Sequence, residues 1–447
     1  MRIRFQLAFD ALRYSFTFTP VVLALLGLAL AFASLELDHQ AARFPVSRSI
    51  LLYTGGVDSA RSVLSTVAAS VLSVAALAFS ICITALALAA GQFGSRLLRN
   101  FLDDGAFKWT LGIFSATFLF CLVVLRSTRG AEDGGVFVPQ LSISIALLLT
   151  ITCVLLLCFF LNHVARSIQA PYVCADAAKD LHREIERLFA VVQRQRGHKA
   201  QKPILAPSFS SATPIFGTRD GYVKVLNYDF LIDLARRENL VFEMKTRPGE
   251  FAFRGEPILR VLSTQNAPIS SENTVQLEEN VRHAVVLGRS RSALQDPEYG
   301  INQLVEIAVR ALSPAINDPF TAGTCLDHLG AALRHVLRLE LPSPLLCDET
   351  GKLRVVAKAW TFSGLCDAAF NMIRQYGRDS ASVSIHLLET LEKVAHACDS
   401  EEERAIIAHH AKMTRRECQA EIEGISDKND VEERFARVMA ALEEGKT

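Results

Sequence analysis

The sequence predicts a polytopic α-helical membrane domain of four spans, followed by a cytosolic α+β region with a small β-barrel or sandwich and then a helical bundle. Three observations predict this fold class. The stretch Ser62–Ser95 contains no Asp, Glu, Lys, Arg or His, and it exceeds the roughly 20 apolar residues that cross a bilayer as a helix. Hydrophobic residues make up 50% of the chain, yet 21% of residues are charged. The 447 residues also exceed what one hydrophobic core normally holds.

Four uncharged runs predict the spans. The first, roughly Phe16–Leu35, is longer than the apolar region of a signal peptide, so we expect it to be retained. The others are expected at Val63–Ala90, Trp109–Leu125 and Leu141–Leu161. After span two, Phe93–Asp104 carries an apolar stripe at helical spacing. This stripe fits either an interfacial amphipathic helix or a continuation of span two that packs on protein.

The positions of Lys and Arg predict the orientation. One side of the membrane carries the larger set: Arg2, Arg4, Arg13, Arg96, Arg99, Lys108, Arg166, Lys179, Arg183 and Arg187. The opposite side carries Arg43, Arg48, Arg61, Arg126 and Arg129. Because positive loops stay in the cytoplasm, we expect both termini on the cytoplasmic side of a bacterial inner membrane. No span has an ionisable carboxylate, Lys or Arg in its middle, which argues against a proton-driven carrier but not against a passive channel.

Small hydroxylated residues form a stripe along span two: Thr66, Ser70, Ser73, Ser80 and Thr84. Thr66, Ser73 and Ser80 recur every seventh residue, so they share one face of a helix. Such residues allow close helix packing and hydrogen bonds between helices. The stripe is therefore interpreted either as a packing seam or as the wall of a narrow aqueous path.

The chain is expected to divide into four parts. A four-span transmembrane domain covers residues 1–166, and a juxtamembrane helix with a linker covers 167–200. A small β-rich domain follows at 201–268, and a helical cytosolic domain at 269–447. Ala175–Arg194 has apolar residues at helical spacing and either pairs protomers or packs on its own domain.

The β-rich part shows short strand patterns separated by turn residues. Gly221–Val225 and Leu240–Lys245 are strand-like, and Arg247–Val261 contains Pro-Gly and Arg-Gly turns. This pattern resembles a half-motif of lipoyl and biotinyl carrier barrels. No Lys stands where carriers place the modified one, since Leu262 to Gln265 follow the motif and Lys245 precedes it. We therefore expect a structural barrel or sandwich without a prosthetic group.

The last part is expected to be helical. Predicted helices cover Ser271–Val286, Ile301–Leu312, a segment from Pro319 through Arg338, Val355–Tyr376, Ser380–Ala397 and Asp430–Leu442. Ser400 and Glu403 form a capping box that opens a further helix.

One connection in this helical part carries a candidate ligand site. Ser313-Pro314 and Asp318-Pro319 each fit an N-cap followed by proline, so the segment can be two helix starts in a row. Alternatively, it is a site for a small ion or ligand, because helix N-termini attract anions and Asp318 attracts a cation or hydroxyl donor. The candidate ligand-binding residues are Arg289, Arg291, Glu306, Asn317, Asp318 and Asp327.

Several function classes find no support in the sequence. It contains no GxSxG, P-loop, GxGxxG after a strand or HExxH motif, so no catalytic residue is assigned. The ten cysteines form no CxxC pair or zinc pattern, which predicts reduced thiols and no metal site. A net charge of zero gives no basic field for nucleic acid. No cofactor is expected.

Three segments together resemble a known family. Span two continues through Gln92–Phe101, and Gln295–Ile301 and Ala311–Pro319 follow later. These segments resemble the bacterial predicted membrane proteins called domain of unknown function 2254, over nearly the whole chain. The resemblance implies a polytopic membrane protein with a cytosolic C-terminal region and brings no established activity.

The sequence thus predicts a non-enzymatic inner-membrane protein in a lipid bilayer. We expect a homo-oligomer whose spans form a channel-like conduit, with the cytosolic domain as its regulator. The first alternative is a membrane-bound sensor or scaffold that binds a small ligand near Asn317-Asp318, and the second is a membrane hydrolase.

Overall fold

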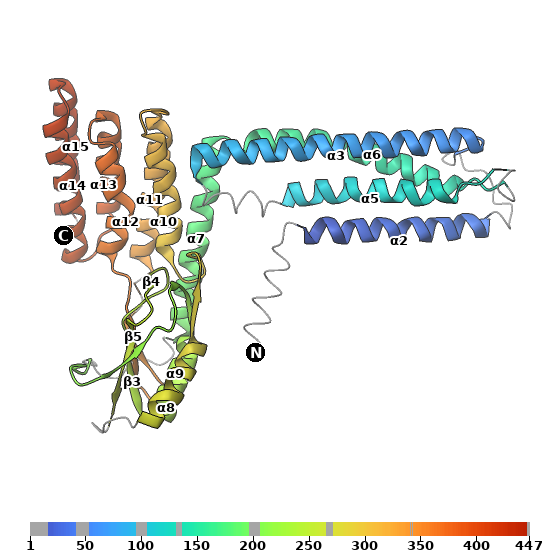
Figure 1. Cartoon of the computed structure of the whole chain (residues 1–447). Coiled ribbons are helices and arrows are strands. Elements are labelled where there is room, and N and C mark those ends of the chain that lie inside the picture. Colours follow the sequence, from blue (N-terminus) through green and yellow to red (C-terminus); the bar gives the residue numbers. More distant parts are fainter. Residues whose placement is uncertain are drawn as a thin grey trace. The chain divides into compact units, whose positions relative to one another are not determined.

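The computed structural model describes residues 17–41, 53–94, 105–130, 136–195, 206–264, 271–339, 341 and 343–444 (Figure 1). The chain divides into two compact units, Met1–Tyr172 and Val173–Thr447, here called the membrane unit and the polar unit. The predicted amphipathic segment after span two falls almost entirely outside the described residues, which resume at Gly105.

The membrane unit contains the predicted spans as four long helices. They are α2 (Phe18–Ala41), α3 (Val57–Phe93), α5 (Gly105–Ser127) and α6 (Gln140–Ser167). Each is long and apolar enough to cross a membrane. The helices extend beyond the expected spans because a helix continues into the interface, where water and head groups satisfy its ends.

The helix α5 lies at the centre of the membrane unit and packs against the other three. Gly27 of α2 and Gly112 of α5 permit close approach, since a Cβ at either position would collide with the opposite helix. The core is filled by large apolar side chains, among them Phe114, Phe120 and Ile143, which are almost fully buried. The interior of this unit is therefore a packed apolar core.

A buried carboxylate ties two of these helices together. Asp38 lies in the last turns of α2, beyond the predicted end of span one at Leu35, and it caps the N-terminus of α6. Its oxygens accept hydrogen bonds from the backbone amides of Leu141 and Ser142, both at 2.9 Å, and from the Ser142 hydroxyl at 2.6 Å. An aspartate at this position satisfies amides that a helix start leaves unpaired.

The helix α7 (Ala170–Gln195) leads into the polar unit, whose described residues form two sheets. The larger sheet has the order β1 (Thr213–Phe216), β5 (Pro257–Ser263), β3 (Leu240–Met244), β8 (Leu353–Val356) and β7 (Leu345–Cys347). Among the described strands of this sheet, β3 and β8 pair in parallel and the other neighbours are antiparallel. The smaller sheet is β4 (Phe251–Ala252), β2 (Gly221–Leu226) and β6 (Val285–Gly288), all antiparallel. Both sheets share one core that includes Phe242 and Val223.

This sheet arrangement corrects part of the prediction. The larger sheet is open and mixed, with β1 and β7 at its edges, so a closed barrel or sandwich is not confirmed. The strands β6, β7 and β8 come from the part expected to be helical. In particular, Val355 is buried in β8 and the predicted Val355–Tyr376 helix starts only at Phe362. Strands of three or four residues are too short to show an alternating pattern.

Two helices cover the sheets and six follow them. The first two are α8 (Tyr228–Arg237) and α9 (Ser271–Ala284). The later six are α10 (Pro297–Ala311), α11 (Pro319–Arg338), α12 (Phe362–Tyr376), α13 (Ala381–Ala395), α14 (Glu401–Glu421) and α15 (Ile425–Glu444). The predicted capping box of Ser400 and Glu403 opens α14.

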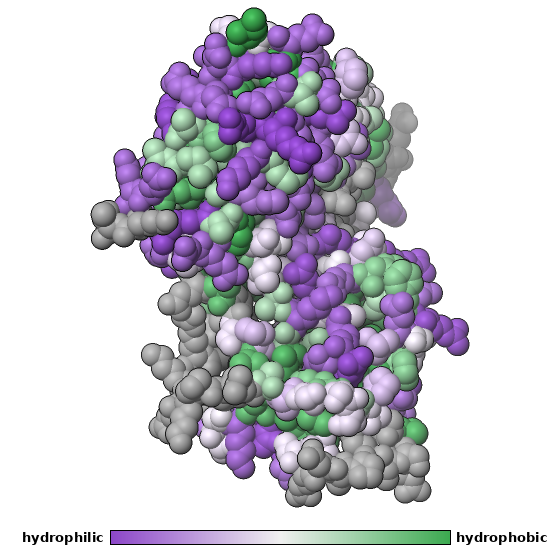
Figure 2. Space-filling view, turned by 90° about the vertical axis from the view of Figure 1, so that its left-hand side faces the viewer, coloured by the Kyte–Doolittle hydropathy of each residue, from purple (hydrophilic) through white to green (hydrophobic). Residues whose placement is uncertain are grey.

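The six later helices form an antiparallel bundle of hairpins (Figure 1). The helices α10, α12 and α14 pack in one row, and α11, α13 and α15 in the other. The upper part of the face drawn in Figure 2, which belongs to this bundle, is mostly hydrophilic. Amphipathic helices with a polar outer face are typical of water-soluble bundles.

Candidate functional site

The predicted stripe of α3 lies on the outer surface of the membrane unit. All five of its residues are exposed: Thr66, Ser70, Ser73, Ser80 and Thr84. The residues of α3 that pack inside the unit lie on a different face and are mostly small and apolar, such as Ala68, Ala78 and Ala85. The stripe is therefore free to face lipid or another protein.

The hydroxyls of the stripe bond to their own helix. Ser73 Oγ donates to the carbonyl of Ala69, and Thr84 Oγ1 donates to the carbonyl of Ser80, both at 2.9 Å. Such bonds let a hydroxyl lie in lipid without a large penalty. Each oxygen still has acceptor capacity for a partner. Chemically, the stripe can form a close polar contact with a second helix.

The structure uses Asn317 and Asp318 to build the α10–α11 turn. Asn317 has a positive φ of 49°, and its amide donates to the Ser313 carbonyl at 2.9 Å. Asp318 is the N-cap of α11 and accepts from the amide of Thr321 at 3.1 Å and from its hydroxyl at 2.5 Å. Asp318-Pro319 is therefore a helix start, whereas Ser313-Pro314 opens a turn and no helix begins there.

The other predicted ligand residues have partners in different places. Arg291 bonds to Asp296, and Glu306 pairs with Arg310 one turn further along α10. Asp327 pairs with His386 and Lys393 of α13. Arg289 is exposed. Arg291, Glu306 and Asp327 therefore each contact a different partner. That these residues bind one ligand together stays a prediction.

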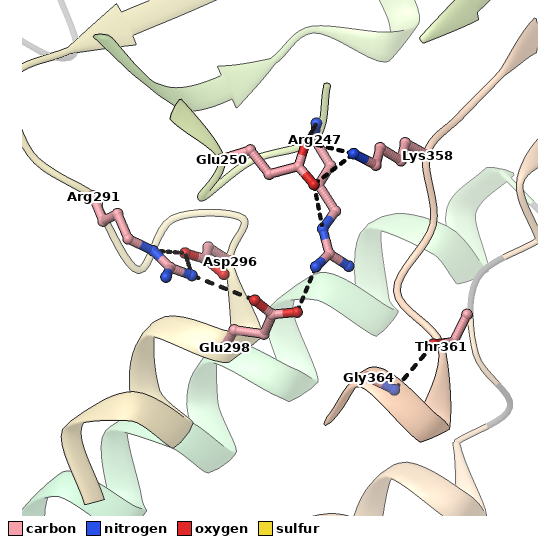
Figure 3. Close-up of polar contacts among 8 residues, drawn as sticks. All are labelled: Arg247, Glu250, Arg291, Asp296, Glu298, Lys358, Thr361 and Gly364. Atoms are coloured by element: carbon pink, nitrogen blue, oxygen red, sulfur yellow. Dashed lines mark hydrogen bonds and ion pairs between the residues drawn. The ribbon is translucent and has the colours of Figure 1, made fainter. Parts of the chain in front are cut away.

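A charged network forms around the start of α10 (Figure 3). Arg247, in the β3–β4 connection, contacts Glu298 at 2.6 Å and Glu250 at 3.3 Å. Lys358 contacts Glu250 at 2.7 Å, and Arg291 contacts Asp296 at 2.7 Å. The guanidinium of Arg247 also lies over the Trp360 ring, 5.7 Å from its centre. The network joins the turn between the two sheets to the helical bundle.

Two acids in and beside this network are strongly perturbed. Burial raises the pKa of Asp296 to about 6, although Arg291 opposes this shift. Burial, with the charges of Asp180 and Asp296, raises the pKa of Glu184 on α7 to about 8. Within the described chain, Asp296 Oδ1 and Glu184 Oε2 are buried and have no hydrogen-bond partner. At neutral pH Glu184 is therefore mostly protonated, whereas Asp296 is mostly ionised opposite Arg291.

Sequence reasoning missed this network because its members are far apart along the chain. The one local signal was Asp296 before Pro297, which marks a helix start. Gly249 also belongs to this site, but its role is visible only in the folded structure. It has a φ of +92°, and a Cβ there would collide with the Asp296 carboxylate. Only glycine permits this approach of the β3–β4 turn.

A buried pair of thiols joins α7 to α11. The Sγ atoms of Cys174 and Cys325 lie 3.5 Å apart. Their hydrogen bond lowers the pKa of Cys174 and, with burial, raises the pKa of Cys325 well above its usual value. The Asp318 carboxylate acts to raise the pKa of both thiols, so it lies near them. Within the described ranges, no group of three or more His, Cys, Asp or Glu can hold a metal ion.

Comparison with known proteins points to one family. A family model described as "Predicted membrane protein (DUF2254)" matches residues 13–393. "Uncharacterized protein Rv1290c" of Mycobacterium tuberculosis (strain ATCC 25618 / H37Rv) is 28% identical over 393 residues, 88% of this chain and 74% of the relative. "Uncharacterized protein Mb1321c" of Mycobacterium bovis has the same identity and coverage. No solved structure matches.

Proposed function

Because the chain belongs to the DUF2254 family of predicted membrane proteins, we propose that it is an integral membrane protein that self-associates through the outer face of α3. The hydroxyl stripe then lies between protomers. The observation that carries the proposal is the exposure of Thr66, Ser70, Ser73, Ser80 and Thr84 on a helix whose small apolar face is already used inside the chain.

The packing inside the membrane unit supports a polar path between protomers rather than within one chain. The four helices enclose buried Phe114, Phe120 and Leu64, and the polar side chains Asp38 and Ser142 that are buried with them are hydrogen-bonded to each other. Serine and threonine on a helix surface favour close helix contacts in lipid. In an oligomer, the same hydroxyls would also line a narrow path for a small polar solute or ion. The full proposal is a channel-like assembly in the inner membrane. Both termini lie in the cytoplasm, and the polar unit regulates the channel.

The sensor alternative has less support from the geometry. The Asp318 carboxylate is occupied by the amide and hydroxyl of Thr321, and Asp327 is paired with α13. A ligand would have to replace these partners. We therefore rank a small-ligand sensor at this turn below the oligomer.

The substitution Ser73→Leu tests the proposal. A bulky side chain should block the close approach of α3 helices, and native mass spectrometry should then show a shift of half or more of the protein to smaller species. Thr152→Leu is the matched control, because Thr152 is also exposed on its helix α6 and bonds back to the Leu148 carbonyl at 2.9 Å.

Two results separate the parts of this proposal. If Ser73→Leu assembles as well as Thr152→Leu and conductance is also unchanged, the stripe faces lipid and self-association through α3 is wrong. Planar-bilayer recording tests the path itself. If the unmutated protein conducts, and an assembled Ser73→Leu variant conducts differently, the stripe lines a path. If the unmutated oligomer does not conduct, self-association is retained and the channel function is wrong.

A further inference from the structure

Cys174 of α7 and Cys325 of α11 bring two free thiols into contact inside the polar unit. Their Sγ atoms lie 3.5 Å apart, although the two residues are 151 positions apart along the chain. Both side chains are fully buried. Two sulfur atoms at this separation are only about 1.5 Å farther apart than in a disulfide. The pair is therefore placed for a covalent bond between α7 and α11.

Small side chains beside the two thiols allow the helices to come close. Ala177 and Ala178 follow Cys174 by three and four residues, and Ala322 precedes Cys325 by three, so each alanine shares a helix face with a thiol. All three alanines are almost fully buried. The distance between packed helices is set by the side chains at the contact. This part of the interface therefore accommodates the small movement that a disulfide requires.

A second contact further along the same two helices keeps the thiols facing each other. The rings of His182 on α7 and His335 on α11 stack with their centres 5.6 Å apart. The helices are thus held together at two levels while both cysteines are reduced. A disulfide would fix an arrangement that already exists rather than build a new one.

The two thiols differ in acidity, and this difference gives each a separate role. The hydrogen bond with Cys325 lowers the pKa of Cys174, although burial and the Asp318 carboxylate oppose the shift. The same bond, together with burial, raises the pKa of Cys325 well above its usual value. The thiolate is the form of cysteine that an oxidant attacks. Cys174 is therefore the thiol that reacts first, and Cys325 is the thiol that completes the disulfide.

We propose that Cys174 and Cys325 form a reversible redox switch, in which hydrogen peroxide oxidises the pair to a disulfide that fastens α7 to α11. The Cys174 thiolate attacks one peroxide oxygen, so that an S–O bond forms and the O–O bond breaks. The hydroxide that leaves takes up the proton that Cys174 lost and becomes water. This first step leaves a sulfenic acid on Cys174.

The second step uses the neighbouring thiol. The Cys325 sulfur attacks the sulfenic sulfur of Cys174, an S–S bond forms and the S–O bond breaks. The departing hydroxide takes the proton of Cys325 and leaves as a second water. The two thiols together lose two electrons, and the peroxide gains both.

Burial of the pair makes the switch depend on movement of the two helices. Peroxide reaches the thiols when the α7–α11 interface opens locally, and the disulfide then prevents further opening. A dithiol reductant restores both thiols by exchange. A disulfide that forms and is reduced again is the kind found in proteins of a reducing compartment. This inference is independent of self-association through α3.

Peptide mapping of the full chain in lipid nanoparticles tests the proposal. The folded protein is treated with a small excess of hydrogen peroxide, the remaining thiols are alkylated in denaturant, and a digest without reductant is analysed by mass spectrometry. We expect at least half of Cys174 in a peptide linked to Cys325, and dithiothreitol should remove the link. Cys347 is the internal control for access of the oxidant, because it is more exposed than either thiol of the pair.

The variant Cys325→Ser separates the switch from simple oxidation. It keeps Cys174 and removes the second sulfur, so peroxide should leave a sulfenic acid on Cys174 that dimedone traps. Hydrogen exchange measures the fastening of the helices. Oxidation of the unmutated protein should slow amide exchange around Cys174 and Cys325 at least tenfold, whereas oxidation of Cys325→Ser should not slow it.

Each outcome decides the question. A Cys174–Cys325 link with slower exchange, both reversed by dithiothreitol, supports the switch. Oxidation of Cys347 while Cys174 and Cys325 stay reduced contradicts it, as does sulfinic acid on Cys174 without a link. A link that leaves amide exchange unchanged would show that the disulfide does not fasten α7 to α11, and it would overturn the proposal. Peptide mapping requires only the unmutated protein, so it decides the chemistry even if Cys325→Ser does not fold.

Discussion

At the residue scale, Glu184 is a carboxyl group held in a largely buried site of the polar unit. It lies on α7 against Gly300, where any side chain would collide with its carboxylate or with Leu181. Burial and nearby acids raise its pKa from 4.5 to about 8. Below pH 4.5 the group is neutral in folded and unfolded chains. Between pH 4.5 and 8 the folded chain holds the proton more tightly, so stability falls as pH rises.

Glu184→Gln should remove this dependence. The variant keeps the shape of the side chain and eliminates the charge that the site disfavours. We expect it to be more stable than the unmutated protein at pH 8 by about 1–3 kcal/mol, after a discount for residual solvent, and nearly equal at pH 4.5. Thermal unfolding followed by tryptophan fluorescence from pH 4.5 to 8 measures the difference.

Glu186→Gln provides the control for this prediction. Glu186 is exposed on the same helix, so its replacement should leave the pH dependence unchanged. Parallel stability curves for Glu184→Gln and the unmutated protein would show that the Glu184 carboxyl ionises without cost in the folded chain.

At the scale of helices, Asp38 is the main polar link between α2 and α6. Asp38→Ala removes the acceptor for two backbone amides and the Ser142 hydroxyl. Because these donors are partly or fully buried, the loss should cost about 2–3 kcal/mol. Unfolding in detergent micelles, monitored by circular dichroism, should occur at a lower temperature. The unfolding temperature of Asp38→Asn should lie between those of Asp38→Ala and the unmutated protein, since the amide keeps one acceptor oxygen.

Glu36→Ala is the comparison for Asp38→Ala. Glu36 is exposed on the same helix and its carboxylate accepts from Gln40, so only a small loss is expected. A loss for Glu36→Ala as large as that for Asp38→Ala would mean that the cap contributes little to the membrane unit.

The elements differ in how well the sequence predicts them. Long uncharged runs predict the spans because lipid imposes both length and composition on a helix. The strands β6, β7 and β8 were missed, since each has only three or four residues and is stabilised by partners distant along the chain. The parallel pairing of Phe242 with Val355 is an example. Local periodicity carries no information on such pairs.

The candidate sites show the same limit. Their spacing of seven residues puts Thr66, Ser73 and Ser80 on one side of α3, where all three are exposed. However, α3 has two faces of small residues, and the sequence does not reveal which one is used inside the chain. Packing of α5 on the alanine face, which includes Ala68 and Ala78, decides this. The charged network depends even more on the fold, because residues such as Arg247 and Glu298 meet only after the sheets and bundle form.

At the scale of the whole molecule, the chain forms two compact units. The membrane unit buries its aromatic core and leaves the hydroxyl stripe of α3 outside. The polar unit follows the membrane unit at α7, and only Ile168 and Gln169 lie between the end of α6 and the start of α7. This connection is the physical basis for the proposed regulatory role of the polar unit.

The mass of the unmutated protein in lipid tests the central proposal most directly. The protein is extracted in lipid nanoparticles without detergent, and its mass is measured by native mass spectrometry over a range of expression levels. Self-association through α3 predicts particles with two or more copies of the chain at every level. Particles that hold a single copy of the 49.1 kDa chain throughout would contradict it.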